Sequence, residues 1–340
     1  MVFSKRKKIL ITGAAGYVGA TLVATLNGEY EVVGFGHPSL HKAMEGQVAR
    51  IIKGDVADYK ALSRAAKGAY AIIHTASPTK ESWCNEHPYE ALRTIVYGTR
   101  NVRRIAEENK VPLVIHFSTQ AVYSNFAKRP LPLREDMTLE PDTLYGALKA
   151  LAEEELRDKR PRIPERSSVR GRQEIRDKTR IVILRPANIY GIGAGVLRRN
   201  VVSVFAENAQ NGKPLIVSGD GKQKVDFVHV RDVARLVALI LKRPEVRDQR
   251  RETRDEGRPV VINAGSGRAT SICDIARLVV AEAKRLKKKP PEIVSKKIPK
   301  ETIAADRWLS IAKARKQYGW KPRITLNKGI RELFYEKQIL

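Results

Sequence analysis

The sequence predicts an α/β protein built on a doubly wound parallel sheet, with a smaller lobe formed by the C-terminal part of the chain. Short apolar runs alternate with longer mixed segments through the first half, as they do in repeated strand–helix–strand units. After Pro186 this alternation becomes irregular, which indicates a second lobe. At 340 residues the chain is long enough for both parts.

Six apolar runs are the predicted strands, and six strands complete a doubly wound sheet of the Rossmann type. They cover residues 9–12, 31–35, 49–53, 71–74, 113–118 and 181–184. Apolar residues recur at helical spacing in three of the intervening segments, residues 20–26, 88–108 and 144–156. We therefore expect residues 1–186 to form the sheet domain, with a basic insertion at about 157–180.

The predicted second lobe covers residues 187–340, and some of its segments are expected to return to the first domain. It contains Gly/Pro-rich loops at 190–195 and 217–221, and helices near 230–241, 271–286 and 326–334. Because open α/β proteins bind ligands at the carboxyl edge of the sheet, we expect this lobe to cover that edge and bind the substrate. The Arg-rich segments 157–180 and 243–258 are interpreted as surface excursions.

The sequence argues against a membrane-spanning protein, a secreted protein and a disulfide- or metal-based structure. No run approaches the roughly 20 apolar residues of a membrane-spanning helix. The basic residues 1–8 lead into the first strand without an apolar signal segment, so we expect a cytoplasmic protein with no membrane partner. Cys84 and Cys273 stand in unrelated contexts and offer neither a disulfide framework nor metal-ligand spacing, so no metal is expected.

The net charge of +27 raises the question of a nucleic-acid partner. Much of the excess lies in two segments: residues 157–180 hold ten Lys/Arg against four Asp/Glu, and residues 284–300 hold eight against one. Neither segment interleaves aromatic residues, which stacking on single-stranded bases would require. We therefore interpret the charge as a solvated surface that attracts anionic substrates, and do not expect nucleic acid as the partner.

A glycine-rich turn directly follows the first strand, where residues 12–19 read Thr-Gly-Ala-Ala-Gly-Tyr-Val-Gly before a predicted helix. Glycines let the backbone turn tightly beside a pyrophosphate, and the helix N-terminus offers N–H groups and a partial positive charge. The turn therefore predicts a dinucleotide site. Its expected contacts are Gly13, Gly16, Tyr17, Val18 and Gly19.

The end of the second strand leaves the choice of dinucleotide open. An acidic residue there would bind the adenosine ribose and favour NAD, but residues 34–39 contain none. Gly36 and His37 are the expected contacts at this neutral tip, which would also admit the 2′-phosphate of NADP. Asp55 and Val56 follow the third strand, and Asp55 is expected either to bind the adenine amino group or to cap the next helix.

Tyr145 and Lys149 stand four residues apart in a predicted helix and therefore share one face. An ammonium close to a phenol lowers the phenol pKa, so the tyrosine can take a hydroxyl proton as hydride leaves carbon. Ser118 and Thr119 end an apolar strand at the edge where the nicotinamide is expected, and a hydroxyl there can orient the reacting oxygen. Together they predict an alcohol-oxidising or carbonyl-reducing site.

With these motifs the chain resembles the extended short-chain dehydrogenase/reductases, in the NAD-dependent epimerase/dehydratase group that includes UDP-glucose 4-epimerase. The resemblance spans nearly the whole chain. It is carried by residues 12–19, 54–55, 74–76, 98–102, 118–123, 145–149, 185–191, 219–221, 226–232, 263–267 and 319–322.

The resemblance implies roles for individual residues. Thr119, Tyr145 and Lys149 would be the catalytic residues, with Tyr145 as acid/base and Lys149 as pKa depressor and ribose ligand. Cofactor contacts would also include Ala76, Ser118 and Pro186. Substrate contacts would be Thr119, Asn188 and Lys224, the last beside Val225, where the family often has an Arg that contacts the diphosphate. The family also implies a homodimer formed through helices 88–108 and 144–156.

Two further positions differ from the family pattern. Ile95 replaces the Asn often found before the Gly-Thr pair, and Gln120-Ala121 replaces the Asp-Glu pair of sugar-nucleotide dehydratases, which disfavours 4,6-dehydration. We expect an NAD- or NADP-dependent nucleotide-sugar epimerase, of the UDP-glucose/UDP-galactose type, working through a transient 4-keto intermediate. The alternatives are an NADPH-dependent reductase of a keto-sugar nucleotide or other carbonyl, and a non-catalytic relative that binds nucleic acid.

Overall fold

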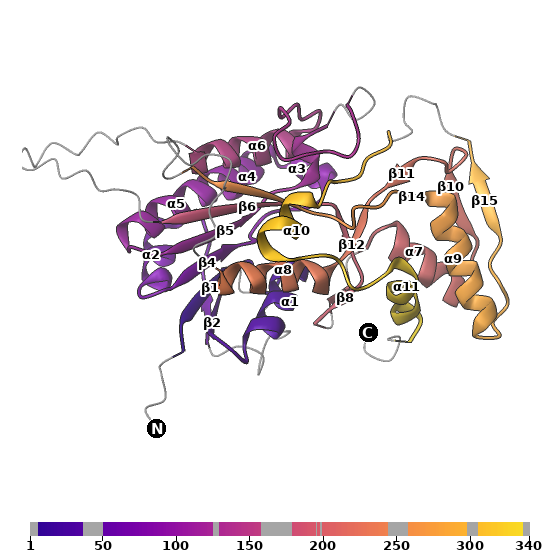
Figure 1. Cartoon of the computed structure of the whole chain (residues 1–340), viewed down its shortest axis with the longest axis horizontal. Coiled ribbons are helices and arrows are strands. Elements are labelled where there is room, and N and C mark those ends of the chain that lie inside the picture. Colours follow the sequence, from indigo (N-terminus) through magenta and orange to yellow (C-terminus); the bar gives the residue numbers. More distant parts are fainter. Residues whose placement is uncertain are drawn as a thin grey trace, which may run out of the picture.

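A seven-stranded parallel sheet is the centre of the computed structural model (Figure 1). The structure describes residues 6–36, 50–124, 129–157, 179–194, 196–197, 199–243, 258–297 and 305–335. The strand order is β13-β6-β5-β4-β1-β2-β3, a doubly wound arrangement that confirms the predicted fold class. The strands are β1 (Lys8–Thr12), β2 (Glu31–Gly36), β3 (Arg50–Lys53), β4 (Ala71–His74), β5 (Leu113–Phe117), β6 (Arg180–Pro186) and β13 (Val260–Ala264).

The seventh strand, β13, was not predicted. Its apolar run is only three residues long and follows the Arg-rich segment, so periodicity gives little signal there. Val260–Ala264 nevertheless pairs with β6 along its whole length, from Val260 with Val182 to Ala264 with Pro186. A segment from the C-terminal half therefore completes the first sheet. The six predicted strands are present, with ends that differ by up to two residues.

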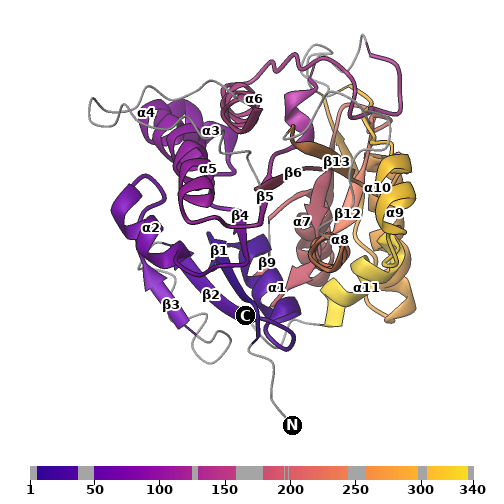
Figure 2. The same cartoon turned by 60° about the vertical axis from the view of Figure 1, so that its left-hand side comes forward.

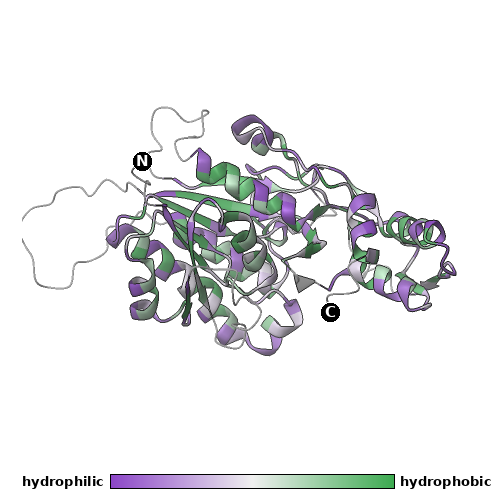
Figure 3. Cartoon of the chain, turned by 90° about the horizontal axis from the view of Figure 1, so that it is seen from below, coloured by the Kyte–Doolittle hydropathy of each residue, from purple (hydrophilic) through white to green (hydrophobic). Residues whose placement is uncertain are grey.

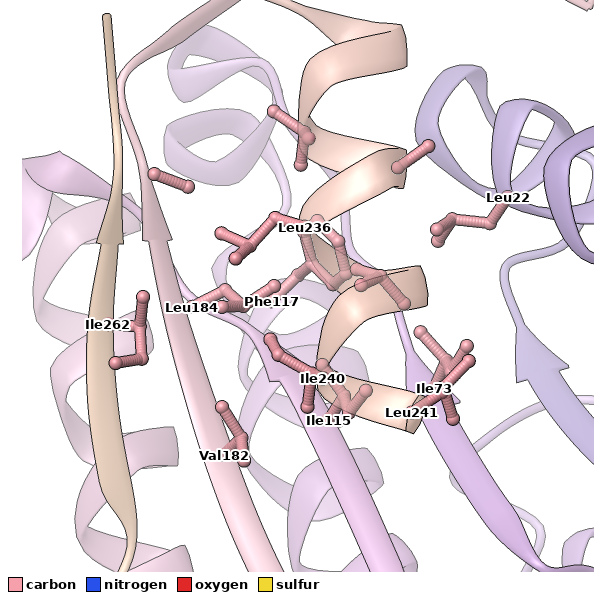
Figure 4. Packing of buried hydrophobic residues seen from close by; sticks show 14 of the residues in the cluster. Leu22, Ile73, Ile115, Phe117, Val182, Leu184, Leu236, Ile240, Leu241 and Ile262 are labelled. Carbon is pink, nitrogen blue, oxygen red and sulfur yellow. The ribbon is translucent and has the colours of Figure 1, made fainter. Parts of the chain in front are cut away.

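Helices cover both faces of the sheet. One face carries α1 (Tyr17–Leu26) and α8 (Val230–Lys242), and the other carries α2 (Tyr59–Ala66), α5 (Gly98–Glu108) and α6 (Leu144–Arg157). Along β1, Ile9 and Ile11 pack towards α1 and α8 while Leu10 packs towards α2 and α5, as the two-residue period of a strand requires. Figure 4 shows Leu236 and Ile240 of α8 against the strand residues of this core.

The predicted helix at 88–108 is interrupted. It consists of α4 (Pro88–Leu92), a π-helical turn (Arg93–Tyr97) and α5, and a short helix α3 (Glu81–Glu86) precedes it. In the π turn the backbone N–H of Gly98 bonds the carbonyl oxygen of Arg93, five residues earlier. α4, α5 and α6 lie together on one side of the molecule, as Figure 2 shows.

A separate hydrophobic cluster forms the second lobe, at the far end from β2 (Figure 1). It is built by α7 (Val201–Gln210), α9 (Ile272–Arg285), α11 (Leu326–Tyr335) and the parallel pair β10 (Leu215–Ser218) and β15 (Ile293–Lys296). Figure 3 shows hydrophobic residues along the central strands and hydrophilic residues on the outer sides of the helices. The predicted division of the chain at residue 186 stays a prediction.

The remaining elements are short. They are β7 (Asn188–Tyr190), β8 (Ile192–Gly193), β9 (Val196–Leu197), β11 (Lys224–Val225), β12 (Phe227–His229), β14 (Thr270–Ser271), α10 (Ala312–Tyr318) and the 3-10 helix Gln120–Val122. Within the described ranges, no helix is both long and apolar enough to cross a membrane. Most of the two predicted surface excursions, residues 158–178 and 244–257, lies outside the described residues.

Candidate functional site

The loop between β1 and α1 is packed so tightly that two of its glycines are sterically required. A Cβ on Gly13, whose φ is +69°, would lie 2.8 Å from the backbone of Ala76, and a Cβ on Gly19 would lie 2.1 Å from the Gly13 carbonyl oxygen. Gly16 is the N-cap of α1, and no side chain caps this helix end or places an acid in its first turn. The helix N-terminus is therefore suited to an anionic group.

Two other predicted cofactor contacts, Tyr17 and Gly36, adjoin this loop. Tyr17 donates its hydroxyl to the Gly191 carbonyl oxygen at 2.7 Å, which ties α1 to the turn between β7 and β8. Gly36 ends β2 beside the loop, and its neighbour Phe35 accepts a hydrogen bond from the Gly13 N–H. His37 lies outside the described residues.

Asp55 and Val56 follow β3, as predicted. Asp55 accepts hydrogen bonds from the Ala57 N–H at 2.8 Å and from Arg93 at 2.7 Å, and its side chain is about half exposed. Asp58, not Asp55, caps α2, because its carboxylate accepts the Ala61 N–H. The carboxylate of Asp55 is thus placed in a strand-to-helix loop without serving as a helix cap.

Seven of the predicted site residues line one cavity of about 180 Å³. They come from α1, the end of β5, α6, the end of β6 and the start of β7, and are Val18, Ser118, Thr119, Tyr145, Lys149, Pro186 and Asn188. The cavity lies at the carboxyl end of the parallel strands, where ligands bind in open α/β sheets. A phenol, an ammonium and a hydroxyl in one cavity can take a proton from an alcohol and return it.

Lys149 is buried, and its Nζ donates to the Phe117 carbonyl oxygen at 2.8 Å. The same Nζ lies 6.0 Å from the centre of the Tyr145 ring. Burial lowers the pKa of Lys149 to about 8, although the negative charge of Glu153 acts in the opposite direction. Thr119 Oγ1 accepts the Ala121 N–H at 3.2 Å, so its hydroxyl proton can be donated to a bound ligand.

Behind the cavity lies a buried ion pair that the sequence did not reveal. Glu153 follows Lys149 by one helical turn, and its carboxylate accepts hydrogen bonds from Arg185 at 2.6 and 2.9 Å and from the Ser118 hydroxyl at 2.6 Å. Arg185 also donates to the Tyr123 hydroxyl at 2.9 Å. The hydrogen bonds of Arg185 hold the pKa of Glu153 low despite its burial. The pair fixes α6 against the strands that lead to Thr119 and Pro186.

Two buried histidines lie side by side on β4 and β5, below the cavity. Their ring centroids are 5.3 Å apart. His74 Nδ1 lies 2.7 Å from Thr12 Oγ1, and His74 Nε2 lies 3.2 Å from Thr99 Oγ1. Because Thr99 already donates its proton to the Ile95 carbonyl oxygen, His74 must carry its proton on Nε2. Burial lowers the pKa of His74 to about 3, so it is neutral; burial also lowers that of His116.

The predicted substrate contacts are divided between two places. Asn188 lines the cavity, where its Nδ2 donates to the Asp226 carbonyl oxygen at 3.1 Å. Lys224 is exposed on β11 and does not line the cavity; its backbone N–H bonds Asp306.

The cavity also contains residues that the sequence analysis did not select. They are Thr75, Ser77, Thr79, Phe117, Gln120, Ala187, Ile189, Arg199 and Asn200. Ser77 and Thr79 follow β4 at the carboxyl edge, so their strand-end position was a usable signal. Arg199 and Asn200 precede α7, a helix that the irregular pattern after residue 190 did not predict.

Comparison with known proteins gives a consistent result. The sequence profile of the "NAD dependent epimerase/dehydratase family" matches residues 9–254. The chain is 27% identical to a dTDP-L-rhamnose 4-epimerase of Burkholderia thailandensis, covering 96% of this chain and 94% of that protein. It is 26% identical to a putative UDP-glucose 4-epimerase of Methanocaldococcus jannaschii, covering 96% of each.

Structural comparison supports the fold. The crystal structure of UDP-glucose 4-epimerase from Thermotoga maritima, solved with UDP-glucose, superposes with a TM-score of 0.79 at 22% identity, covering 98% of this chain and all of that one. A reductase is also among the similar proteins: dTDP-4-dehydro-6-deoxyglucose reductase of Escherichia coli is 22% identical over 97% of both chains. The family profile covers well over half of the sequence, so this chain belongs to the NAD-dependent epimerase/dehydratase family.

Proposed function

We propose that the protein is an NAD(P)-dependent nucleotide-sugar epimerase, of the UDP-glucose/UDP-galactose type, that inverts the sugar at C4 through a transient 4-keto sugar. The observation that carries the proposal is that Thr119, Tyr145 and Lys149 line one cavity at the carboxyl ends of β5 and β6, together with Val18 from the glycine loop. Relatives named as sugar-nucleotide 4-epimerases support it.

The dinucleotide would lie with its pyrophosphate at the N-terminus of α1. Gly13, Gly16 and Gly19 keep side chains out of this turn, and the helix start has neither an acidic residue nor a side-chain cap that would compete for its N–H groups. Ala76, Ser118, Lys149 and Pro186 complete the proposed contacts, with Asp55 and Val56 at the adenine end. When bound, the nicotinamide accepts a hydride from the sugar C4 and returns it.

The chain's own residues would move the proton. The Tyr145 phenolate takes the proton of the 4-hydroxyl as C4 becomes a carbonyl, and the phenol returns it when the carbonyl is reduced from the other side. Lys149 favours the phenolate because its ammonium is held close to the phenol ring. Thr119 donates its hydroxyl proton to the reacting oxygen and so orients it.

Two residues are proposed to bind parts of the substrate other than the reacting carbon. The Asn188 side chain already donates to the Asp226 carbonyl oxygen, so its amide oxygen is the group that it can offer to the sugar. Lys224 is proposed to attract the diphosphate, because its ammonium is exposed on β11 and the substrate is anionic.

The experiment is to incubate the purified protein, saturated with NAD, with UDP-glucose, UDP-galactose, UDP-glucuronate and dTDP-sugars and to follow the C4 epimers by NMR. We expect conversion of at least one pair, and Tyr145→Phe should lower its rate about 10²- to 10⁴-fold. Tyr335→Phe, a change at a tyrosine of α11 that is 57% exposed, is the matched control and should leave the rate unchanged. Failure of the wild type to convert any of these sugars would contradict the proposal.

A second candidate is an NADPH-dependent reductase of a keto-sugar nucleotide or another carbonyl. It is favoured by the absence of an acidic residue in residues 34–39, where a carboxylate would bind the ribose of NAD. The similar reductase of Escherichia coli supports it as well. Identification of the dinucleotide released on denaturation separates the two: tightly held NAD favours the epimerase, whereas an empty site together with steady NADPH consumption favours the reductase.

We further propose that the protein is a homodimer in which α4, α5 and α6 of two copies pack together. Large apolar side chains are exposed on this side of the molecule: Tyr89 at 66%, Tyr97 at 40% and Leu151 at 51%. An exposed apolar surface on neighbouring helices is typical of an interaction site.

The expected cytoplasmic location stays a prediction.

A further inference from the structure

The carboxyl end of β2 is where a dinucleotide bound at the glycine loop presents its adenosine ribose. Gly36 ends β2, about 20 residues after Gly16, at the spacing where an acidic residue binds the ribose hydroxyls of NAD. A Cβ on Gly36 would lie 3.8 Å from the Gly13 backbone, so position 36 faces the glycine loop. The chain therefore offers no carboxylate from β2 to the ribose.

Lys53 lies beside Gly36 on the neighbouring strand. It ends β3, and its Cα is the register partner of the Gly36 Cα. One position earlier, Phe35 and its partner Ile52 both pack on the α2 and α5 side of the sheet. Because side chains alternate between the two faces along a strand, positions 36 and 53 both face the side of α1 and the glycine loop.

The ammonium of Lys53 has no counter-charge within the described part of the chain. The Lys53 side chain is exposed, and it forms no ion pair with a described residue. The carboxylates that follow it are occupied: Asp55 pairs with Arg93 at 2.7 Å, and Asp58 caps α2. The ribose end of the dinucleotide site thus presents a free positive charge, where a carboxylate would favour NAD.

We infer that Lys53 binds the 2′-phosphate of NADP(H) and gives the protein a preference for NADP(H) over NAD(H). NADP differs from NAD only by this phosphate on the adenosine ribose. An exposed ammonium on a flexible four-carbon stem is a common ligand for phosphate, as a point charge. Gly36 contributes by leaving out the carboxylate that would repel the phosphate.

This inference rests on the proposed function, which places the dinucleotide pyrophosphate at α1. It holds for both candidate reactions, because hydride is transferred at the nicotinamide, at the opposite end of the cofactor from the 2′-phosphate. An epimerase with this preference would retain NADP without consuming it, whereas a reductase would consume NADPH.

The test is a binding measurement, independent of any substrate. The full-length protein, freed of bound dinucleotide, is titrated with NADP⁺ and with NAD⁺ in a calorimeter at low ionic strength. We expect NADP⁺ to bind at least about 10-fold more tightly, the effect of one hydrogen bond to a charged group. The ratio of the two Kd values should decrease as salt is added, because ions screen an exposed charge pair.

Variants of Lys53 show whether this side chain is the cause. Lys53→Met should remove the preference and leave the Kd for NAD⁺ unchanged, and Lys53→Glu should reverse the preference, because its carboxylate repels the phosphate. The matched control is Arg50→Glu, at an exposed residue of the same strand. Arg50 is the register partner of Val33, which packs on the other face, so this variant should keep the wild-type preference.

The contradicting results are distinct. If the wild type binds NAD⁺ as tightly as NADP⁺, or if Lys53→Met keeps the wild-type ratio, Lys53 does not select the cofactor, while the proposed function stands. If neither dinucleotide binds the wild type, the proposed dinucleotide site and the proposed function both fail, and the role of Lys53 fails with them.

Discussion

The Ser118 hydroxyl donates a 2.6 Å hydrogen bond to the buried carboxylate of Glu153. Ser118 directly precedes Thr119, and Glu153 lies one helical turn after Lys149. The bond therefore joins the strand end that carries one proposed catalytic residue to the helix that carries the other two. Arg185 shares the same carboxylate, so the relative position of β5, β6 and α6 depends on one negative charge.

Glu153→Gln should destabilise the protein strongly. It keeps the side-chain shape but leaves the Arg185 guanidinium, which is 1% exposed, without its counter-charge. Removing one partner of a buried ion pair costs about 3–5 kcal/mol. Denaturant unfolding gives the free energy change. The control is Glu155→Gln, at a partly exposed residue of α6 that pairs with the exposed Arg100, and it is expected to cost less than about 1 kcal/mol. Equal effects of the two variants would contradict this account of the pair.

The pH dependence of activity should report Lys149. Burial lowers its pKa to about 8, and catalysis uses the ammonium, so kcat/KM should fall as the pH rises through about 8. The contribution of Lys149 to folding stability changes with pH in the opposite direction. Between about pH 8 and pH 10.5 the unfolded chain holds a proton that the folded chain has released. The stability that this group contributes therefore rises with pH. A kcat/KM that stays constant up to pH 10 would contradict the assignment.

Glu153 should also influence this pH profile. Its negative charge raises the pKa of Lys149, partly offsetting the burial. In a preparation of Glu153→Gln that remains folded, the high-pH fall in kcat/KM should therefore shift to lower pH. No shift, or a shift to higher pH, would contradict this electrostatic coupling.

His116→Leu should stabilise the protein. Both ring nitrogens of His116 are buried and have no hydrogen-bond partner among the described residues, so an apolar side chain removes an unfavourable burial of about 1–3 kcal/mol. The pKa of His116 is lowered well below 6.5, so stability falls as acid protonates the unfolded chain below about pH 6.5, and the variant should lose less on acidification.

His74→Leu is the matched comparison for His116→Leu. His74 pairs with the hydroxyls of Thr12 and Thr99, so its removal leaves those groups unpaired and should lower the melting temperature. The measurement is the melting temperature of both variants between pH 4 and 8. A decrease at His116 as large as that at His74 would show that the ring nitrogens of His116 are paired in solution.

Leu151→Asp should dissociate the proposed dimer. The change places a charge on the exposed apolar face of α6, where Leu151 is 51% exposed. Ile216→Asp, at a 44% exposed residue of β10 in the second lobe, is the control and should leave the dimer intact. Sedimentation velocity measures the outcome. A wild type that sediments as a monomer would contradict the dimer, and dissociation by Ile216→Asp would place the interface elsewhere.

Local patterns in the sequence predicted the sheet, the glycine loop and the Tyr145–Lys149 pair, because each depends on residues close together in the chain. Glu153 could have been found as the next residue on the Lys149 face, four positions further on. Its partner Arg185 could not, since their contact depends on how α6 packs against β6. The role of β13 depends in the same way on pairing with a strand some 80 residues earlier.

The residues that line the cavity were also predicted only in part, because some of them depend on how distant segments pack. Thr119 was predicted from a strand end and Pro186 from the family resemblance, whereas Arg199 depends on α7 beginning at the cavity, after a loop without periodicity. Lys224 was expected near the substrate from its place in the sequence, yet the β11–β14 pairing places it apart from the cavity lining. Sequence distance to a motif is thus a weak guide to distance from the reacting carbon.

The most direct test of the proposed epimerase uses UDP-glucose carrying deuterium at C4, with the full-length protein and NAD. Oxidation and reduction at C4 within one site predict UDP-galactose that keeps its deuterium at C4, with no net consumption of NAD(P)H. Loss of the label to water, or product formation that consumes one NADPH per turnover, would contradict the account.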